Sequence, residues 1–250
     1  MKIAIIGTVG VPASYGGFET LVENLIEDDT VCFTVYCSGQ HYSERKPVYK
    51  NAELIYIPLS ANGVQSIIYD IWSILHALFS GHKHLLILGT SGAFVLPLLR
   101  LFCPSVNIVI NIDGLEWKRQ KWKGFAKQFL KFSERLAVKF SSVVVADNAA
   151  IAKHIQSNYN AVCETIAYGG DHALIDKTLV PTVETAIGKE AYAFALCRIE
   201  PENNVHVILD AFSSSKMNLI FVGNWQSSDY GRSLIELHSS NSNINLLDPI

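Results

Sequence analysis

Two carboxylates follow a run of apolar residues in the middle of the chain. Asp113 and Glu116 come directly after 106–112, a segment typical of a buried strand. Open α/β sheets bind ligands beyond the carboxyl ends of parallel strands, so both residues are candidate catalytic groups. Either carboxylate can act as a general base or hold a ligand hydroxyl. The structural alternative makes Asp113 a cap or turn residue and Glu116 an ordinary charge at a helix N-terminus.

A long glycine-containing turn separates the first expected strand, 2–7, from the helix that follows it. Gly16 and Gly17 stand where that helix begins, and a glycine pair there lets the backbone approach a ligand closely. Free N–H groups at a helix N-terminus favour an anion, so the turn is a candidate site for a phosphate or diphosphate. The alternative is that the two glycines only make a tight turn.

The same turn permits a competing hypothesis, that of an NAD(P)-dependent dehydrogenase or epimerase. The G-x-x-G-x-x-A spacing from Gly7 to Ala13 approximates a dinucleotide fingerprint, and Tyr42 and Lys46 have the spacing of a Tyr-x-x-x-Lys pair. Such a pair needs a helix to hold the lysine one turn from the tyrosine. Pro47 disfavours a helix at Lys46, so the hydride-transfer hypothesis is the weaker one.

A second connection suited to phosphate lies near the end of the chain. Arg198 follows the expected strand 192–197 and precedes a helix, where a guanidinium can make a bidentate contact with phosphate. Gly223 and Asn224 follow the next strand, 218–222, and again place a glycine at a strand end. Two such turns in two domains predict a ligand cleft between the domains.

Basic and aromatic residues are interspersed over 116–139. This segment holds eight lysines and arginines against two glutamates, although the whole chain has a net charge of −3. Such a segment suits an anionic membrane surface. A nucleic acid is less favoured because the rest of the chain is acidic, and the third alternative is a solvated helix whose aromatic residues face the sheet. The candidate membrane or acceptor face is Trp117, Lys118, Arg119, Lys121 and Trp122.

These candidate residues need a scaffold, and the chain alternates short β-branched runs with longer helical patterns. This alternation predicts an α/β fold with right-handed crossovers and a doubly wound parallel sheet. Strands are expected at 2–7, 31–37, 53–57, 84–89, 106–112, 142–146, 162–166, 192–197, 218–222 and 243–247. Helices are expected at 17–28, 64–79, 92–102, 121–140, 148–157, 204–213 and 229–238.

The alternation stops near residue 170, which predicts a domain boundary. Residues 1–171 are expected to form a first Rossmann-like domain, 172–190 a linker, and 191–250 a second domain. The second domain has too few elements for an independent doubly wound domain, so we expect the sequence to be cut short.

Composition excludes several classes of protein. A content of 49% hydrophobic residues excludes a long disordered chain, and the net charge of −3 disfavours a basic nucleic-acid binder. Five cysteines without a CxxC pair indicate a reducing cytoplasm rather than a disulfide scaffold. His82 and His84 lack a third ligand and are expected in a surface turn, so no metal site is predicted. No uninterrupted apolar run is long enough to span a membrane.

Several of these motifs together resemble the GT-B glycosyltransferases of family GT4. The segments 14–20 (SYGGFET) and 113–122 (DGLEWKRQKW) are similar to a subgroup containing rhamnosyltransferases of bacterial surface-polysaccharide synthesis. The segments 198–204 and 222–225 fit the same subgroup, and 166–171 resembles the family's inter-domain turn. The resemblance implies a GT-B fold, with a complete N-terminal acceptor-side domain and the start of a nucleotide-sugar-binding domain.

The resemblance also implies an activity, that of a hexosyltransferase. A sugar, rhamnose in this subgroup, would move from a nucleotide-diphosphate sugar to a lipid-linked or growing polysaccharide acceptor. Transfer in the family retains the anomeric configuration and needs neither metal nor other cofactor. The implied location is cytoplasmic, peripheral on the inner face of the plasma membrane.

Site residues carry over from the resemblance by position. Gly16 and Gly17 would lie against the donor, and Arg198 would neutralise the leaving diphosphate. Gly223 and Asn224 belong to the same donor-binding set.

Three departures from the family pattern matter. Asn203 replaces the phosphate-binding lysine that usually follows the arginine, and Asp113 stands where many members carry a histidine. The family's Glu-x7-Glu element would lie beyond residue 250. We therefore expect little or no transferase activity from this chain, and a non-catalytic remnant is the third hypothesis.

Overall fold

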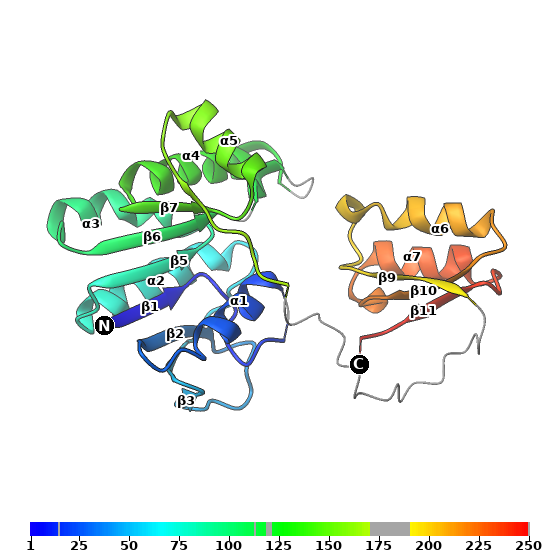
Figure 1. The fold of residues 1–250 in the computed structure, drawn as a ribbon, viewed down its shortest axis with the longest axis horizontal. Helices are drawn as coiled ribbons and strands as arrows, with labels where there is room; N and C mark the ends of the chain where they lie inside the picture. The colour runs from blue at the N-terminus through cyan, green and yellow to red at the C-terminus, as the bar shows by residue number, and fades with distance from the viewer. Residues whose placement is uncertain (15, 113, 119–121, 171–190, 250) are drawn as a thin grey trace. The chain divides into compact units, whose positions relative to one another are not determined.

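The computed structural model describes residues 1–14, 16–112, 114–118, 122–170 and 191–249. The chain divides into two compact units, Met1–His172 and Ala173–Ile250 (Figure 1). The expected linker 172–190 lies outside the described residues, and the acceptor and donor roles of the two units stay predictions.

The first unit is built around a largely parallel sheet. The strand order is β3-β4-β2-β1-β5-β6-β7-β8, and β3 pairs antiparallel with β4. Its elements are β1 (Lys2–Ile6), α1 (Gly17–Leu25), β2 (Cys32–Ser38), β3 (Val48–Tyr49), β4 (Ala52–Ile57), α2 (Gln65–Phe79), β5 (His84–Leu88), η1 (Ala93–Val95), α3 (Leu96–Phe102), β6 (Asn107–Ile112), η2 (Glu116–Lys118), α4 (Gly124–Phe140), β7 (Val143–Ala146), α5 (Ala149–Tyr159) and β8 (Glu164–Thr165).

The chain changes direction across this sheet between β1 and β5. From β1 it runs to β2 and β4 on one side, whereas β5 to β8 follow one another on the other side. Right-handed crossovers then place helices on opposite faces. One core cluster joins the sheet to α2, α3, α4 and α5, and a second joins it to α1. Open α/β sheets bind ligands at the carboxyl ends of the strands where the strand order reverses. A site is therefore expected at the carboxyl ends of β1 and β5.

Helix α2 is fixed to the ends of two strands by one buried tyrosine. The hydroxyl of Tyr69 lies 3.0 Å from the Thr8 carbonyl oxygen and 2.7 Å from that of Tyr36. Thr8 lies two residues beyond the end of β1 and Tyr36 lies within β2, so α2 is held near the carboxyl end of β1. Asp70, the residue after Tyr69 on α2, therefore lies near the carboxyl ends of β1 and β5.

The second unit is smaller and is also built on a parallel sheet. Its elements are β9 (Tyr192–Leu196), η4 (Pro201–Asn203), α6 (Val205–Ser213), β10 (Asn218–Val222), η5 (Trp225–Ser227), α7 (Asp229–His238) and β11 (Ile244–Leu247). The strands are parallel in the order β11-β10-β9, and one apolar cluster joins them to α6 and α7.

The expected elements agree closely with the observed ones. Two differences have clear causes: the two-residue strand β3 is too short to give a periodic signal, and 92–102 divides into η1 and α3 near Pro97. The surface turn expected at 82–84 is wrong for His82. Its imidazole is buried, with Nε2 3.0 Å from the Thr34 hydroxyl and Nδ1 3.1 Å from the Ala77 carbonyl oxygen.

Candidate functional site

A pocket of about 510 Å³ opens at the point where the strand order of the first unit reverses. Gly7 and Gly89 follow the adjacent strands β1 and β5, and α2, η2 and α4 supply the other walls. A Cβ on Gly7 would lie 2.0 Å from the Leu88 carbonyl oxygen, and its φ is +93°. Only glycine fits there, so the two strand ends can approach as closely as the pocket floor requires.

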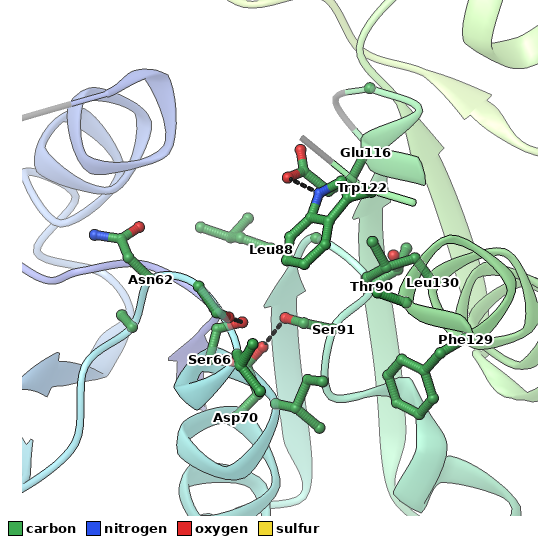
Figure 2. A pocket seen from close by; sticks show the side chains of 18 of the residues that line it. Asn62, Ser66, Asp70, Leu88, Thr90, Ser91, Glu116, Trp122, Phe129 and Leu130 are labelled. Carbon is green, nitrogen blue, oxygen red and sulfur yellow. Dashed lines mark hydrogen bonds between the residues drawn. The ribbon is translucent and has the colours of Figure 1, made fainter. Parts of the chain in front are cut away.

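A buried carboxyl group forms one wall of this pocket. Asp70, on the second turn of α2, is 2% exposed and accepts a hydrogen bond from the Ser91 hydroxyl (Figure 2). Burial raises the pKa of Asp70 to about 7, opposed by hydrogen bonds from Ser91 and the Gly92 backbone. A Cβ on Gly92 would lie 2.6 Å from the Asp70 Cβ, so this contact needs glycine.

Sequence reasoning did not select Asp70 or Ser91. A signal was present, because Asp70 is the one acidic residue in the apolar helix 64–79. An ionisable group in such a helix is buried at a high energetic cost unless it is hydrogen-bonded.

Glu116 and Trp122 line the opposite part of the same pocket. The Trp122 indole N–H donates to the Glu116 carboxylate over 2.9 Å, which draws the ring toward the pocket (Figure 2). The structure thus brings the candidate residue Glu116 to the pocket together with a ring suited to stacking on a sugar. Asp113, Arg119 and Lys121 lie outside the described residues.

The segment that carries Glu116 is anchored through its neighbour Trp117. The buried carboxylate of Glu134, on α4, accepts from the Trp117 indole at 2.9 Å and from the Tyr159 hydroxyl at 2.6 Å. His154 Nε2 lies 2.8 Å from the same carboxylate. Burial, together with the hydrogen bond to Glu134, raises the pKa of Tyr159 above its ordinary value. This network positions η2 against α4 and α5.

Gly16 and Gly17 line a different hollow, which also involves Tyr168. The turn before them is closed by the chain's own carboxylate: Glu19 accepts from the Thr8 hydroxyl at 2.8 Å and the Val9 backbone at 2.7 Å. Gly16 has a φ of +99°, a backbone conformation that is strained for other residues, so glycine is favoured there. The contact with a donor expected of both glycines stays a prediction.

The predicted donor residues of the second unit meet at one edge of its sheet. β9 and β10 pair in parallel with Leu196 opposite Val222, so Arg198 and Asn224 occupy equivalent positions beyond the two strand ends. Arg198 is exposed, and the Asn203 amide donates to its carbonyl oxygen over 2.7 Å. Gly223 is required by packing, because a Cβ would lie 2.4 Å from the Ile199 Cδ1.

The geometry disfavours the dinucleotide alternative. α1 begins at Gly17, ten residues after Gly7, so the fingerprint spacing does not lead into a helix. Tyr42 and Lys46 lie outside any helix, as the following proline predicted. The Tyr42 hydroxyl donates to the Pro12 carbonyl oxygen over 2.9 Å.

A set of exposed apolar side chains lies on helices α2 and α3 of the first unit. Ile68, Trp72, Leu75 and Phe79 recur along α2 at helical spacing and are 38–90% exposed. On α3, Leu98, Leu101 and Phe102 are 55–75% exposed. We call these seven residues the apolar surface. By contrast, Trp117 and Trp122 are only partly exposed, with both indole N–H groups bound to carboxylates.

Neither a metal cluster nor a membrane-spanning helix is found in the described part of the chain. No three histidines, cysteines or carboxylates gather there at ligating distance. None of its helices combines the length and apolar character that crossing a bilayer requires.

Solved structures show the fold class. Sucrose-phosphate synthase from Thermosynechococcus elongatus matches with a TM-score of 0.78 at 13% identity, over 100% of this chain and 70% of that one. UDP-GlcNAc 2-epimerase from Neisseria meningitidis, bound to UDP-GlcNAc, matches with a TM-score of 0.62 at 16% identity, over 100% and 73%. Arabidopsis thaliana UGT89C1, complexed with UDP-L-rhamnose, gives 0.54 at 9%, over 100% and 69%. These likenesses confirm the expected GT-B type of α/β fold.

Comparisons of sequence give a family for the first unit. The search of curated proteins found no match. The family model described as a domain of unknown function, DUF1972, matches residues 1–171. The match covers more than half of the chain, which therefore belongs to the DUF1972 family.

Proposed function

We propose that the chain is a glycosyltransferase component that moves a sugar from a nucleotide-diphosphate sugar to a hydroxyl-bearing acceptor. The observation that carries the proposal is the likeness of the whole chain to sucrose-phosphate synthase and to proteins solved with UDP-GlcNAc and UDP-L-rhamnose. Rhamnose as the sugar, and a lipid-linked or polysaccharide acceptor, rest on the GT4 resemblance of the sequence motifs. Retention of configuration without a metal rests on it too.

The donor diphosphate is proposed to bind the second unit. Arg198 is an exposed guanidinium at the carboxyl end of β9, the position from which it can make a bidentate contact with a phosphate. It would neutralise charge on the leaving diphosphate, the main electrostatic demand of this reaction. Gly223 and Asn224 share the same sheet edge. Asn203 supports the Arg198 backbone and adds no positive charge.

The acceptor is proposed to bind the first unit in the pocket at the carboxyl ends of β1 and β5. The Trp122 ring offers a stacking face, and Glu116 holds that ring in place. A role of Asp113 in the same reaction remains part of the proposal.

A membrane partner fits the outer surface of the first unit. The apolar surface on α2 and α3 is accompanied by a row of exposed cations on α4, at Lys127, Lys131, Arg135 and Lys139. Apolar side chains beside lysines and arginines are typical of proteins that lie on anionic bilayers. This supports a protein that works on the inner face of the plasma membrane, where lipid-linked acceptors are found.

Donor binding is the sharpest test, because it does not require the acceptor to be identified. Isothermal titration with UDP-glucose, UDP-GlcNAc, dTDP-rhamnose and GDP-mannose is expected to reveal binding that Arg198→Ala weakens about tenfold or more. Lys216→Ala, an exposed change in the same unit, is the control. Binding of NAD(P) in place of every nucleotide sugar would reject the proposal in favour of the dehydrogenase or epimerase alternative.

A further inference from the structure

The Asp70–Ser91 pair has a direction that decides what it can bind. Asp70 accepts hydrogen bonds from the Ser91 hydroxyl and the Gly92 backbone N–H. The single O–H donor of Ser91 is therefore already engaged by ionised Asp70. A hydroxyl has one donor and two lone pairs, and Ser91 therefore presents only lone pairs to the pocket. A ligand group beside Ser91 must then be a hydrogen-bond donor.

The rest of the pocket narrows the class of ligand. Among its described lining residues, Asp70 and Glu116 are the ionisable groups, and both are acids. A phosphate would be repelled from this lining, whereas an uncharged ring can pack against Trp122 and Phe129. The wall therefore suits a neutral, hydroxylated molecule with an apolar face, which is the chemistry of a sugar ring.

We propose that Ser91, oriented by Asp70, receives the hydrogen bond of the acceptor hydroxyl in this pocket, takes that hydroxyl's proton during transfer and gives its own proton to Asp70. The inference rests on the proposed function, because it identifies the pocket's ligand as the acceptor. Ser91 touches the reacting hydroxyl, and Asp70 acts through Ser91 as a positioning residue. Figure 2 shows the two side chains pointing toward one another at the pocket wall.

The step balances without any further reactant. The acceptor oxygen forms a bond to the anomeric carbon of the nucleotide sugar, and the bond from that carbon to the diphosphate breaks. Its electron pair leaves on the diphosphate. The acceptor's proton moves to the Ser91 Oγ while the Ser91 proton moves to the Asp70 carboxylate, which becomes a neutral acid. Burial favours that neutral form.

Asp70→Asn changes the direction of the pair while keeping its shape. The asparagine amide donates to Ser91, which frees the Ser91 proton to point into the pocket. A hydroxyl ligand and its deoxyfluoro analogue then become nearly equivalent, because fluorine accepts a hydrogen bond but cannot donate one. A merely structural role of Asp70 would weaken both ligands alike and leave their ratio unchanged.

The test uses 4-nitrophenyl hexosides and their monodeoxyfluoro analogues, one for each hydroxyl, at pH 8, where Asp70 is ionised. Dissociation constants come from ligand-observed NMR on the 250-residue protein. For one hydroxyl position, wild type is expected to prefer the hydroxyl over fluorine tenfold or more, and Asp70→Asn to reduce this preference to threefold or less. Ser91→Ala is expected to abolish the preference, and the exposed change Asp229→Asn to keep it.

Two results would overturn the inference. One is that no hexoside binds wild type; the other is that Asp70→Asn and Ser91→Ala leave the hydroxyl-to-fluorine preference unchanged while thermal melting shows folded protein. The assay needs no nucleotide sugar, so a failure of this inference can be distinguished from a failure of the proposed function. Hexoside selectivity without nucleotide-sugar binding rejects the transferase, whereas nucleotide-sugar binding without this selectivity rejects only the role of the pair.

Discussion

The indole N–H of Trp117 donates to the buried carboxylate of Glu134 over 2.9 Å, and so ties η2 to α4. The same carboxylate is in contact with His154 and Tyr159. Three elements therefore converge on one group that is 1% exposed. Their junction fixes the segment from which Glu116 and Trp122 reach the pocket.

Replacing this carboxylate should destabilise the first unit. Glu134→Ala leaves three polar partners without their acceptor, and we expect the free energy of unfolding to fall by about 3 kcal/mol. Urea denaturation followed by tryptophan fluorescence measures the change. Lys127→Ala, an exposed substitution on the same helix, should stay within about 0.5 kcal/mol of wild type. Equal effects of the two substitutions would show that the network does not stabilise the unit.

Asp70 predicts how stability depends on pH. Its pKa is about 7 in the folded protein and near 4 when unfolded, so the folded state keeps a proton that the unfolded state releases between these values. The free energy of unfolding should therefore fall as pH rises from about 4 to 7, and the penalty should be constant above that.

The corresponding variant is Asp70→Asn, which cannot ionise. Its stability relative to wild type should be greater at pH 8 than at pH 5 by roughly 1–3 kcal/mol. Denaturant unfolding at the two pH values measures this, with Asp229→Asn as a control that shows no such difference. A stability difference that is the same at both pH values would contradict the raised pKa.

The apolar surface predicts that the protein binds membranes and that one negative charge introduced on this surface weakens the binding. Phe79 is 90% exposed at the end of α2, so Phe79→Glu should leave folding intact while placing a negative charge on the proposed docking surface. We expect at least a fivefold loss of co-sedimentation with phosphatidylglycerol-containing vesicles. Val162→Glu is the matched control, because Val162 is equally exposed outside this surface. If both variants sediment like wild type, the membrane contact lies elsewhere.

The sequence predicted the scaffold well, and also the residues that meet at the carboxyl ends of β9 and β10, for a physical reason. β-branched runs mark parallel strands, and groups after neighbouring strands must meet, as Arg198 and Asn224 do. The Asp70–Ser91 contact was not predictable in this way. It joins α2 to the loop after β5, and depends on how the helix is rotated against the sheet.

Hydropathy also could not separate buried from exposed apolar residues on α2. Tyr69 is fully buried there, whereas Ile68 and Trp72 beside it are 59% and 48% exposed. A helix that is apolar on both faces gives no sequence signal for which face meets the sheet.

Above all, we propose that this chain binds a nucleotide-diphosphate sugar for transfer. Isothermal titration of the sugar-nucleotide panel tests it most directly. We expect binding of at least one nucleotide-diphosphate sugar, weakened about tenfold or more by Arg198→Ala and unchanged by Lys216→Ala and Asp70→Asn. Absence of binding for every member of the panel, with the protein folded, would contradict it.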